Sequence, residues 1–292
     1  MASIRRLLAT ADLHFGLYPR GDANTRRLAE FACSSGADAL AIAGDVADMD
    51  AESFAACLDL FAPFEGLRLV VPGNHDIWSV GAGSRRKYRR TLPAIAAERG
   101  FHMLDKGPVT VGDVGFIGSI GWYDYSLRSR QMDVSLSQYE RKELPGICVW
   151  NDGRYVDWEM SDEQFTDRCL RRLQQHYRSV EPQVETVVAV LHHLPFGELL
   201  YPPSSAAFEF CRAFMGSARF GELLLGFPKV RWVVCGHRHG VGHHTRGHLE
   251  AFAVGSEYHL KRLLELDLGT GRHAVRAFAA PDELSPATEQ EA

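Results

Sequence analysis

Five short segments of this chain place metal-binding side chains directly after an apolar run. They supply carboxylates from Asp, imidazoles from His and one amide from Asn, at residues 12–14 (DLH), 44–45 (GD), 73–76 (GNHD), 192–193 (HH) and 236–239 (GHRH). Imidazole, carboxylate and amide oxygen are the ligands preferred by divalent ions such as Mn, Fe, Co, Ni and Zn. The sequence therefore indicates a metal centre built from five separate parts of the chain.

The apolar runs before these segments have the length and composition of buried strands. They are rich in Val, Ile, Leu and Ala and cover residues 7–11, 39–43, 69–72, 187–191 and 232–235. Continuous runs of this kind are typical of strands buried on both faces. Because ligands of open α/β sheets bind beyond the carboxyl ends of the strands, we expect the five segments to meet at one rim.

The intervening sequence indicates how the strands are connected. Helical patterns at about 24–35, 52–61 and 84–99 separate the first strands, which predicts crossover connections and a parallel sheet. Short strands are predicted at 101–104, 109–111 and 114–119, and antiparallel strands over 251–279. Helices are also expected at 162–177 and 206–225.

We expect residues 1–280 to form a single domain. An aromatic-rich stretch at about 121–185 breaks the rhythm of strands and helices and is interpreted as a cap-like insertion. Residues 281–292 contain Pro, Glu and Ser and are predicted to form a flexible C-terminal tail.

Composition narrows the class of protein. The chain has 292 residues, of which 46% are hydrophobic and 24% charged, and its net charge of -5 provides no general attraction to nucleic acid or anionic membranes. It contains no apolar stretch of the roughly 20 residues that a membrane span needs, and its N-terminus does not resemble a signal peptide. The six cysteines show no CxxC spacing, so we expect reduced thiols and a cytoplasmic location.

The spacing of the candidate ligands suits a pair of ions. Asp12 and His14 lie two residues apart, as do His237 and His239, so each pair projects to the same side of an extended segment. Asp45, in a Gly-Asp turn after a central strand, is the best candidate for a carboxylate that bridges both ions. Two ions about 3.5–4 Å apart can hold a phosphate and generate hydroxide between them.

The motifs DLH, GDVAD, GNHD, LHH and GHRH, in this order, resemble those of the calcineurin-like metallophosphoesterase family. The resemblance implies an α/β fold, a four-layer α/β/β/α sandwich with mixed sheets. It also implies two divalent metal ions, drawn from Mn, Fe, Zn, Ni and Co. The ligands carried over are Asp12, His14, Asp45 and His239 for the first ion, and Asp45, Asn74, His192 and His237 for the second.

The same resemblance assigns catalytic roles. His75 would lie beside the phosphate without binding metal and protonate the leaving oxygen, and Asp76 would orient His75 through a hydrogen bond. The nucleophile would be a metal-bridging hydroxide. His192 is favoured over His193 as the ligand, which leaves His193 as a pocket residue.

The insertion also supplies candidate substrate-binding residues. These are Tyr123, Tyr125, Trp150 and Asn151, with His193 from the fourth motif. The aromatic residues have two interpretations, as local packing of a small cap or as rings that stack on a flat substrate group. A basic run at 85–90 likewise reads either as a solvated helix face or as a contact for a phosphate-rich substrate.

The sequence thus predicts a hydrolase that cleaves a phosphomonoester or phosphodiester, with a small-molecule or nucleotide substrate favoured. A nuclease or a phosphoprotein phosphatase on the same scaffold is the enzymatic alternative, although the weak basicity of the chain counts against nucleic acid. A binding scaffold without catalysis is a third class, and it would be expected to lose ligands that this chain has kept. The sequence makes no prediction of oligomeric state.

Overall fold

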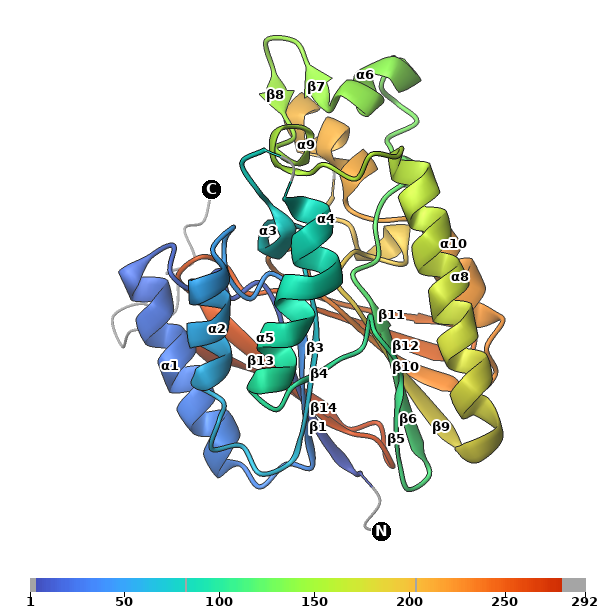
Figure 1. The fold of residues 1–292 in the computed structure, drawn as a ribbon. Coiled ribbons are helices and arrows are strands. Elements are labelled where there is room, and N and C mark those ends of the chain that lie inside the picture. The colour runs from blue at the N-terminus through green and yellow to red at the C-terminus, as the bar shows by residue number, and fades with distance from the viewer. Residues whose placement is uncertain (1–3, 82, 203, 280–292) are drawn as a thin grey trace, which may run out of the picture.

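Two six-stranded sheets, packed face to face, form the centre of the computed structural model, which describes residues 4–81, 83–202 and 204–279 (Figure 1). The first sheet has the order β14 (His273–Phe278), β13 (Lys261–Asp267), β1 (Arg6–Thr10), β2 (Ala39–Ala43), β3 (Leu67–Val71), β4 (His102–Met103). The second has the order β11 (Val241–Arg246), β12 (Leu249–Val254), β10 (Val230–Cys235), β9 (Thr186–Leu191), β6 (Val114–Ser119), β5 (Val109–Val111). Both sheets mix parallel and antiparallel pairs.

Alternate residues of the central strands enter two different cores. In β1, Leu7 and Ala9 pack in the cluster between the sheets with residues such as Val190 of β9. Leu8, between them in sequence, faces the outer cluster with Leu28 of the first helix. A strand with both faces buried needs a continuous apolar sequence, which explains the uninterrupted runs before the metal-binding motifs.

Helices cover the outer face of each sheet. The first sheet is covered by α1 (Pro19–Ser34), α2 (Ala51–Asp59) and the continuous stretch α4 (Ser84–Arg86), η1 (Lys87–Thr91) and α5 (Leu92–Glu98) (Figure 1). The second is covered by α8 (Asp162–Val180) and α10 (Ala218–Leu225) (Figure 1). This confirms the predicted four-layer α/β/β/α sandwich.

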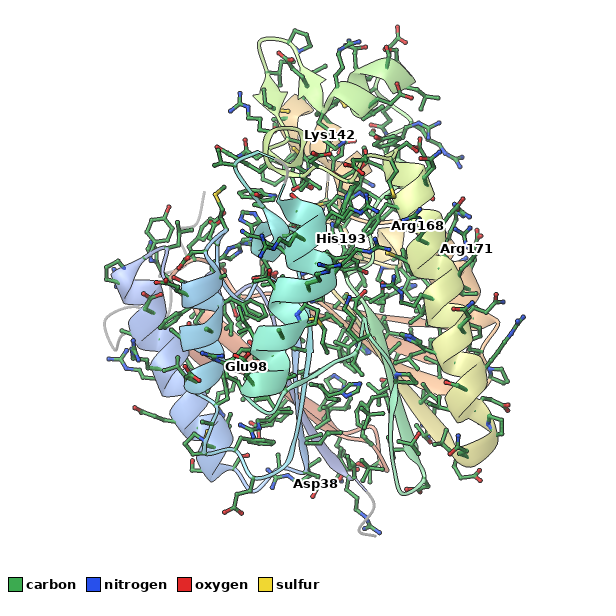
Figure 2. The ribbon with its side chains drawn as sticks, viewed as in Figure 1. Asp38, Glu98, Lys142, Arg168, Arg171 and His193 are labelled. Carbon is green, nitrogen blue, oxygen red and sulfur yellow. The ribbon has the colours of Figure 1, made fainter. Side chains whose placement is uncertain are left out.

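The helix α8 illustrates how an amphipathic sequence is accommodated by the fold. Its Phe165, Cys169 and Leu173 are buried in the outer hydrophobic core, whereas Arg168 and Arg171 face outward (Figure 2). It begins with a capping box in which the Ser161 hydroxyl accepts the backbone N–H of Gln164. The predicted start of this helix at 162 agrees with the structure, and its end lies three residues beyond the predicted 177.

Two predicted segments differ from the structure. The expected helix 206–225 is divided into α9 (Ala206–Cys211), η4 (Arg212–Phe214) and α10, because Gly216 pairs with Leu194 and a Cβ at Gly216 would lie 2.0 Å from the Leu194 carbonyl oxygen. The expected antiparallel strands over 251–279 belong to different sheets. β13 and β14 are antiparallel in the first sheet, but β12 pairs in parallel with β10 in the second.

The predicted insertion at 121–185 also divides into two parts. Residues 121–161, which we call the cap segment, contain α6 (Leu136–Arg141), β7 (Glu143–Leu144), β8 (Cys148–Val149) and α7 (Asp152–Tyr155). Figure 1 shows α6, β7 and β8 projecting above the sheets beside α9, whereas α8 lies along the second sheet as part of the helical layer. Three short helical elements remain, namely α3 (Asn74–Ile77), η2 (Glu181–Gln183) and η3 (Gly197–Leu199).

The predicted tail at 281–292 lies outside the described residues. Within the part of the chain that the structure describes, no helix has the length and apolar character needed to cross a membrane.

Candidate metal centre

All five motif segments meet at one end of the strands, as the strand directions require. Five of the candidate ligands have a left-handed backbone, with positive φ angles at Asp12 (57°), His14 (43°), Asp45 (48°), His237 (66°) and His239 (56°). Residues other than glycine rarely adopt this conformation, and such strain concentrates at functional sites. These tight turns direct side chains from several loops toward the same small region.

The first group of donors comes from the loops after β1, β2 and β10. Asp12, His14, Asp45 and His239 each offer a ligand atom, and these atoms lie within 4.8 Å of one another. His14 Nε2 is 3.3 Å from His239 Nε2 and 3.6 Å from Asp45 Oδ2. This is the set predicted for the first ion.

The second group shares Asp45 with the first. Asp45, His192 and His237 again have ligand atoms within 4.8 Å of one another. His192 Nε2 lies 3.4 Å from Asp45 Oδ2, 3.2 Å from His237 Nδ1 and 3.0 Å from Asn74 Oδ1. These are the residues predicted for the second ion, and a single oxygen, Asp45 Oδ2, faces both groups.

Burial and neighbouring charges shift the pKa values of the groups in this site in different directions. Burial lowers the pKa of both His14 and His237 well below the ordinary value, so both imidazoles are neutral and can offer a lone pair. Burial would raise the pKa of Asp45, but the charge of His192 holds it well below its usual range. The pKa of His192 shifts in the opposite direction. Burial alone would lower it, but the charge of Asp45 raises the pKa to about 9.

One buried atom of the site tests whether metal ions would fit. Among the described residues, Asp45 Oδ2, the oxygen that faces both donor groups, has no hydrogen-bond partner. A buried polar atom without a partner costs about 1–3 kcal/mol, and a coordinated cation would satisfy it. The donor set of carboxylate, imidazole and amide oxygen therefore fits a pair of divalent ions.

The Gly-Asp turn after β2 requires its glycine. Gly44 has φ 86°, and a Cβ there would lie 2.4 Å from Nδ1 of His192. His192 Nδ1 in turn contacts the carbonyl oxygen of Ala43 at 2.9 Å. Because Nδ1 faces this carbonyl, it is an N–H donor, and Nε2 would bind a metal ion after losing its proton.

The structure corrects one predicted contact of His75. The Asp76 carboxylate accepts the backbone N–H groups of Val46, Ala47 and Gly73 at 3.2, 2.9 and 2.8 Å, so it joins the two motif loops. His75 Nδ1 instead contacts Asp48 Oδ1 at 3.1 Å. Asp76 is the third residue of α3 and turns back to the start of its own helix, which explains why it does not reach His75.

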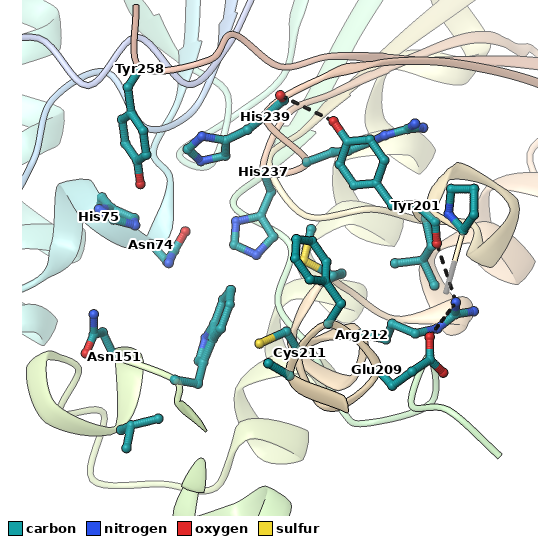
Figure 3. Close-up of a pocket in the computed structure, with 18 of the residues that line it drawn as sticks. Asn74, His75, Asn151, Tyr201, Glu209, Cys211, Arg212, His237, His239 and Tyr258 are labelled. Atoms are coloured by element: carbon teal, nitrogen blue, oxygen red, sulfur yellow. Dashed lines mark hydrogen bonds and ion pairs between the residues drawn. The ribbon is translucent and has the colours of Figure 1, made fainter. Parts of the chain in front are cut away.

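The surroundings of His75 leave two interpretations of its role. Its ring stacks on Trp78 with centroids 3.6 Å apart, and it lines the cavity beside the metal-binding groups (Figure 3). It also belongs to a third set of potential ligands, with His14 and Asp48. The absence of metal binding by His75 therefore stays a prediction.

A cavity of about 460 Å³ opens onto the candidate ligands Asn74, His237 and His239 (Figure 3). Two predicted substrate-binding residues, Trp150 and Asn151, line it. Its other major wall, formed by residues of 200–202 and 207–215, was not predicted from the sequence, because that wall belongs to the chain that returns beside the cap segment.

The other three predicted substrate-binding residues lie in the interior. Tyr123 is fully buried and donates to Asp152 Oδ2 at 3.0 Å, and Tyr125 donates to Asp162. His193 is fully buried, with Nδ1 2.9 Å from the carbonyl oxygen of Ile120, and burial lowers its pKa to about 3. None of the three lines the cavity, so we interpret them as packing residues.

The basic run at 85–90 lies on the helical stretch that covers the first sheet. Arg85 forms an ion pair with Glu159, and Tyr88 is buried against Trp158 and Phe165. No residue of this run lines the cavity. Its arginines therefore fit the interpretation of a solvated helix face, whereas the Lys87 ammonium donates to the carbonyl oxygens of Met49 and Trp78.

Comparison with known proteins agrees with this geometry. The family model of the calcineurin-like phosphoesterases matches residues 5–241, and the chain belongs to this family. It is accordingly a hydrolase of phosphoester bonds. No curated protein sequence matches the chain.

Several solved structures share the fold. The phosphopantetheinyl hydrolase PptH from Mycobacterium tuberculosis is 17% identical with a TM-score of 0.70, covering 89% of this chain and 92% of that one. The TT1561 protein of Thermus thermophilus is 13% identical with a TM-score of 0.59, covering 94% and 99%. A dimetal phosphatase from Danio rerio is 14% identical with a TM-score of 0.54, covering 95% and 100%. At these identities the likeness extends to the fold alone.

Proposed function

We propose that this protein is a dinuclear metal-dependent phosphohydrolase that cleaves a phosphomonoester or phosphodiester of a small molecule. The observation that carries the proposal is the position of Asp45. Its Oδ2 lies 3.6 Å from His14 Nε2 in one donor group and 3.4 Å from His192 Nε2 in the other. A carboxylate shared in this way suits two ions held close together.

The first ion is assigned to Asp12, His14, Asp45 and His239, and the second to Asp45, Asn74, His192 and His237. When bound, the two ions would supply a hydroxide nucleophile at neutral pH and stabilise the charge of the phosphate. The neutral amide of Asn74 limits the negative charge of the ligand set, which favours approach of an anionic substrate.

His75 is assigned as the general acid. It lines the cavity beside Asn74 and His237, where a phosphoester would lie. Its Nδ1 contacts Asp48, so Nε2 is the ring nitrogen available to protonate a leaving oxygen. Asp48 would keep the ring in one orientation, and Trp78 supports one of its faces.

The cavity favours a small substrate. Its volume of about 460 Å³ is in the range of small-molecule pockets, which span about 300–1,000 Å³. The cap segment bounds it through Val149, Trp150 and Asn151. A folded phosphoprotein or a nucleic acid duplex would need a more open approach, so a protein phosphatase or a nuclease is the less favoured alternative.

The proposal is tested by metal analysis and a substrate screen on one sample. The protein is reconstituted with Mn²⁺, and ions per chain are counted by elemental analysis. Activity is then measured on alkyl and aryl monoesters, aryl diesters, nucleotides, single-stranded DNA and a phosphopeptide. We expect two ions per chain and turnover of small esters. At most one ion per chain, or turnover of DNA or phosphopeptide alone, would refute the proposal.

A further inference from the structure

The wall of the cavity opposite the metal-binding side chains is apolar and exposed. The residues that form it are Val149, Trp150, Leu200, Tyr201, Phe208 and Met215. Phe208 is 56% exposed, Val149 40% and Tyr201 39%. Large apolar side chains that gather in a concave site beside a reaction centre indicate a ligand surface.

The charged groups of this wall already have partners in the protein. Arg212 lies 3.5 Å from Glu209 Oε1 (Figure 3). Arg238 donates to the carbonyl oxygen of Leu199 at 2.7 Å, and its guanidinium lies 4.2 Å from the centre of the Tyr201 ring. A second phosphate of a substrate would therefore have to compete with these contacts.

We propose that this wall binds an uncharged apolar group, an aryl or long alkyl chain, esterified to the phosphate that the metal centre holds. The proposal rests on the proposed function and names its substrate class. Burial of apolar area contributes about 25 cal/mol per Å², so burying even part of a ring against this wall should measurably increase the binding affinity. Nucleoside polyphosphates would be poorer ligands, because their additional phosphates would lose water and find few free polar partners on this wall.

The test uses inhibition, which does not depend on the leaving group. Competitive inhibition constants are measured on the Mn²⁺-loaded protein with methylphosphonate, naphthylmethylphosphonate and ADP. We expect the naphthylmethyl compound to bind at least about 10-fold more tightly than methylphosphonate, because of the apolar area it buries. Equal binding of these two compounds, or tighter binding of ADP than of the naphthylmethyl compound, would refute the apolar subsite.

A pair of variants localises the effect. Phe208→Ala should weaken naphthylmethylphosphonate about 5-fold or more and leave methylphosphonate unchanged. Leu136→Ala is the control, because Leu136 is 55% exposed and does not line the cavity. An equal effect of Phe208→Ala on both phosphonates would also refute the subsite. Failure of the proposed function is distinct from either result, since it would appear in the preceding screen as at most one ion per chain or as turnover of DNA or phosphopeptide alone.

A second inference comes from one buried carboxylate of the cap segment. Asp152 is 1% exposed and accepts four hydrogen bonds. Its Oδ1 accepts Asn74 Nδ2 at 3.0 Å and Trp78 Nε1 at 2.6 Å. Its Oδ2 accepts the Tyr123 hydroxyl at 3.0 Å and Trp150 Nε1 at 2.7 Å.

These contacts determine which way Asn74 faces. A carboxylate only accepts hydrogen bonds, so the amide group of Asn74 turned toward Asp152 must be the NH₂. The Asn74 oxygen is thereby directed to the opposite side, where it lies 3.0 Å from His192 Nε2 in the second donor group. Without Asp152, rotation of the amide would replace an oxygen donor with an NH₂ that cannot bind a cation.

The indoles held by Asp152 flank two other residues of the site. Trp78 stacks on His75, and the ring of Trp150 lies 5.7 Å from that of His237 in an edge-on arrangement. We infer that Asp152 is a positioning residue that couples the cap segment to the metal centre. It would orient the Asn74 ligand and fix the rings beside His75 and His237.

The chain offers a matched control in Asp162. This carboxylate is also buried. It accepts hydrogen bonds from the Trp122 indole at 2.8 Å, from the Tyr125 hydroxyl and from the Lys142 ammonium at 2.6 Å. It contacts none of the candidate ligands. Asp152→Asn and Asp162→Asn thus make the same chemical change in the same part of the chain.

The readouts are the indole N–H resonances and metal affinity. The chain has five tryptophans, so its ¹⁵N spectrum resolves a small set of indole signals. Asp152→Asn should shift the Trp78 and Trp150 signals in the metal-free protein and weaken binding of one of two Mn²⁺ ions about 10–100-fold in calorimetry. Asp162→Asn should shift Trp122 and leave both affinities unchanged.

Two outcomes would overturn the positioning role. One is Asp152→Asn binding both ions with wild-type affinity. The other is Asp162→Asn weakening metal binding as much as Asp152→Asn, which would indicate a general loss of stability. If Asp152→Asn fails to fold, Tyr123→Phe, which removes one donor to Asp152 and leaves the other three, should still weaken the same ion more than Tyr125→Phe does.

Discussion

Asp48 and His75 form a hydrogen-bonded pair across two loops, with Asp48 Oδ1 3.1 Å from His75 Nδ1. Asp48 comes from the loop after β2, and His75 from the short helix after β3. The neighbouring Asp76 is occupied by three backbone amides. Orientation of the His75 ring and cohesion of the two loops are therefore carried by different carboxylates.

This division predicts different effects for two conservative changes. Asp48→Asn should reduce kcat by about 10–100-fold with little change in stability, because a positioning partner of the proposed general acid is lost. Asp76→Asn should lower the free energy of unfolding by about 1–3 kcal/mol, because an NH₂ would face a backbone N–H in the interior. Steady-state kinetics gives kcat, and urea denaturation gives the free energy of unfolding, for both variants. The reverse pattern would restore Asp76 as the partner of His75.

Asp45→Ala should be the most damaging change of a single ligand, because Asp45 faces both donor groups. We expect loss of both ions and a fall in activity of several orders of magnitude. The strands do not depend on this side chain, so the circular dichroism spectrum should be unchanged. Elemental analysis after reconstitution gives the answer, and retention of two ions would show that Asp45 does not bridge.

His75→Asn should separate esters by their leaving group. Loss of a general acid costs about 10²–10⁴-fold in rate, and the loss is largest for alkoxides, which need a proton to leave. p-Nitrophenolate leaves without one, so its esters should be affected much less. Metal content should be unchanged. A lost ion would instead assign His75 to the third donor group with His14 and Asp48, and equal slowing of alkyl and aryl esters would make it an electrostatic stabiliser.

Tyr125→Phe should affect stability and leave substrate affinity unchanged. Tyr125 is 2% exposed, and its hydroxyl donates to the Asp162 carboxylate away from the cavity. A hydrogen bond to a charged group contributes about 1.5–3 kcal/mol, so the free energy of unfolding should fall by about that amount. KM for the best substrate of the screen should stay constant. An increase in KM with unchanged stability would return Tyr125 to the substrate-binding residues.

His176 should make folding stability depend on pH. Burial and the nearby Arg172 lower its pKa to about 4 in the folded chain, and an unfolded histidine titrates near 6.5. Between these values the unfolded chain binds more protons, so stability is fully present above pH 6.5 and falls as the pH drops toward 4. The slope is at most about 1.4 kcal/mol per pH unit and smaller for a ring that is partly exposed.

Comparison of Tm for wild type and His176→Gln at pH 7 and pH 5 isolates this contribution. The difference between the two proteins should shift in favour of the variant at pH 5. A difference that is the same at both pH values would mean that His176 does not titrate between them.

Much of the fold and of the donor set could be predicted from the sequence, because both follow from continuous apolar runs. β2 and β9 agree with their predicted ranges to within one residue. Parallel strands bring their carboxyl ends together, which places Asp12, Asp45 and Asn74 at one rim. The edge strand β11 carries no such signal and was not predicted, because polar side chains, among them His243 and His244, make up most of it.

Contacts that depend on how loops cross could not be predicted. Asp76 is adjacent to His75 in sequence, but the turn of α3 directs its carboxylate to residues 46 and 47. Asp152 is 78 residues from Asn74, and only the folded cap segment brings them together. The apolar cavity wall similarly combines β8 with residues that follow β9, and no local pattern links them.

The pairing of β1 with β13 sets an order in which the first sheet can be completed during synthesis. Leu7 and Leu8 are synthesised long before Leu266 and Glu265, with which they are in register. Asp12 follows β1 directly, so one candidate metal ligand is held by a strand that lacks one of its two partners until β13 has been made. A nascent chain halted before residue 261 would leave one edge of β1 open, as an unpaired strand edge prone to aggregation. The sheet beside Asp12 is therefore completed only after β13 has been synthesised.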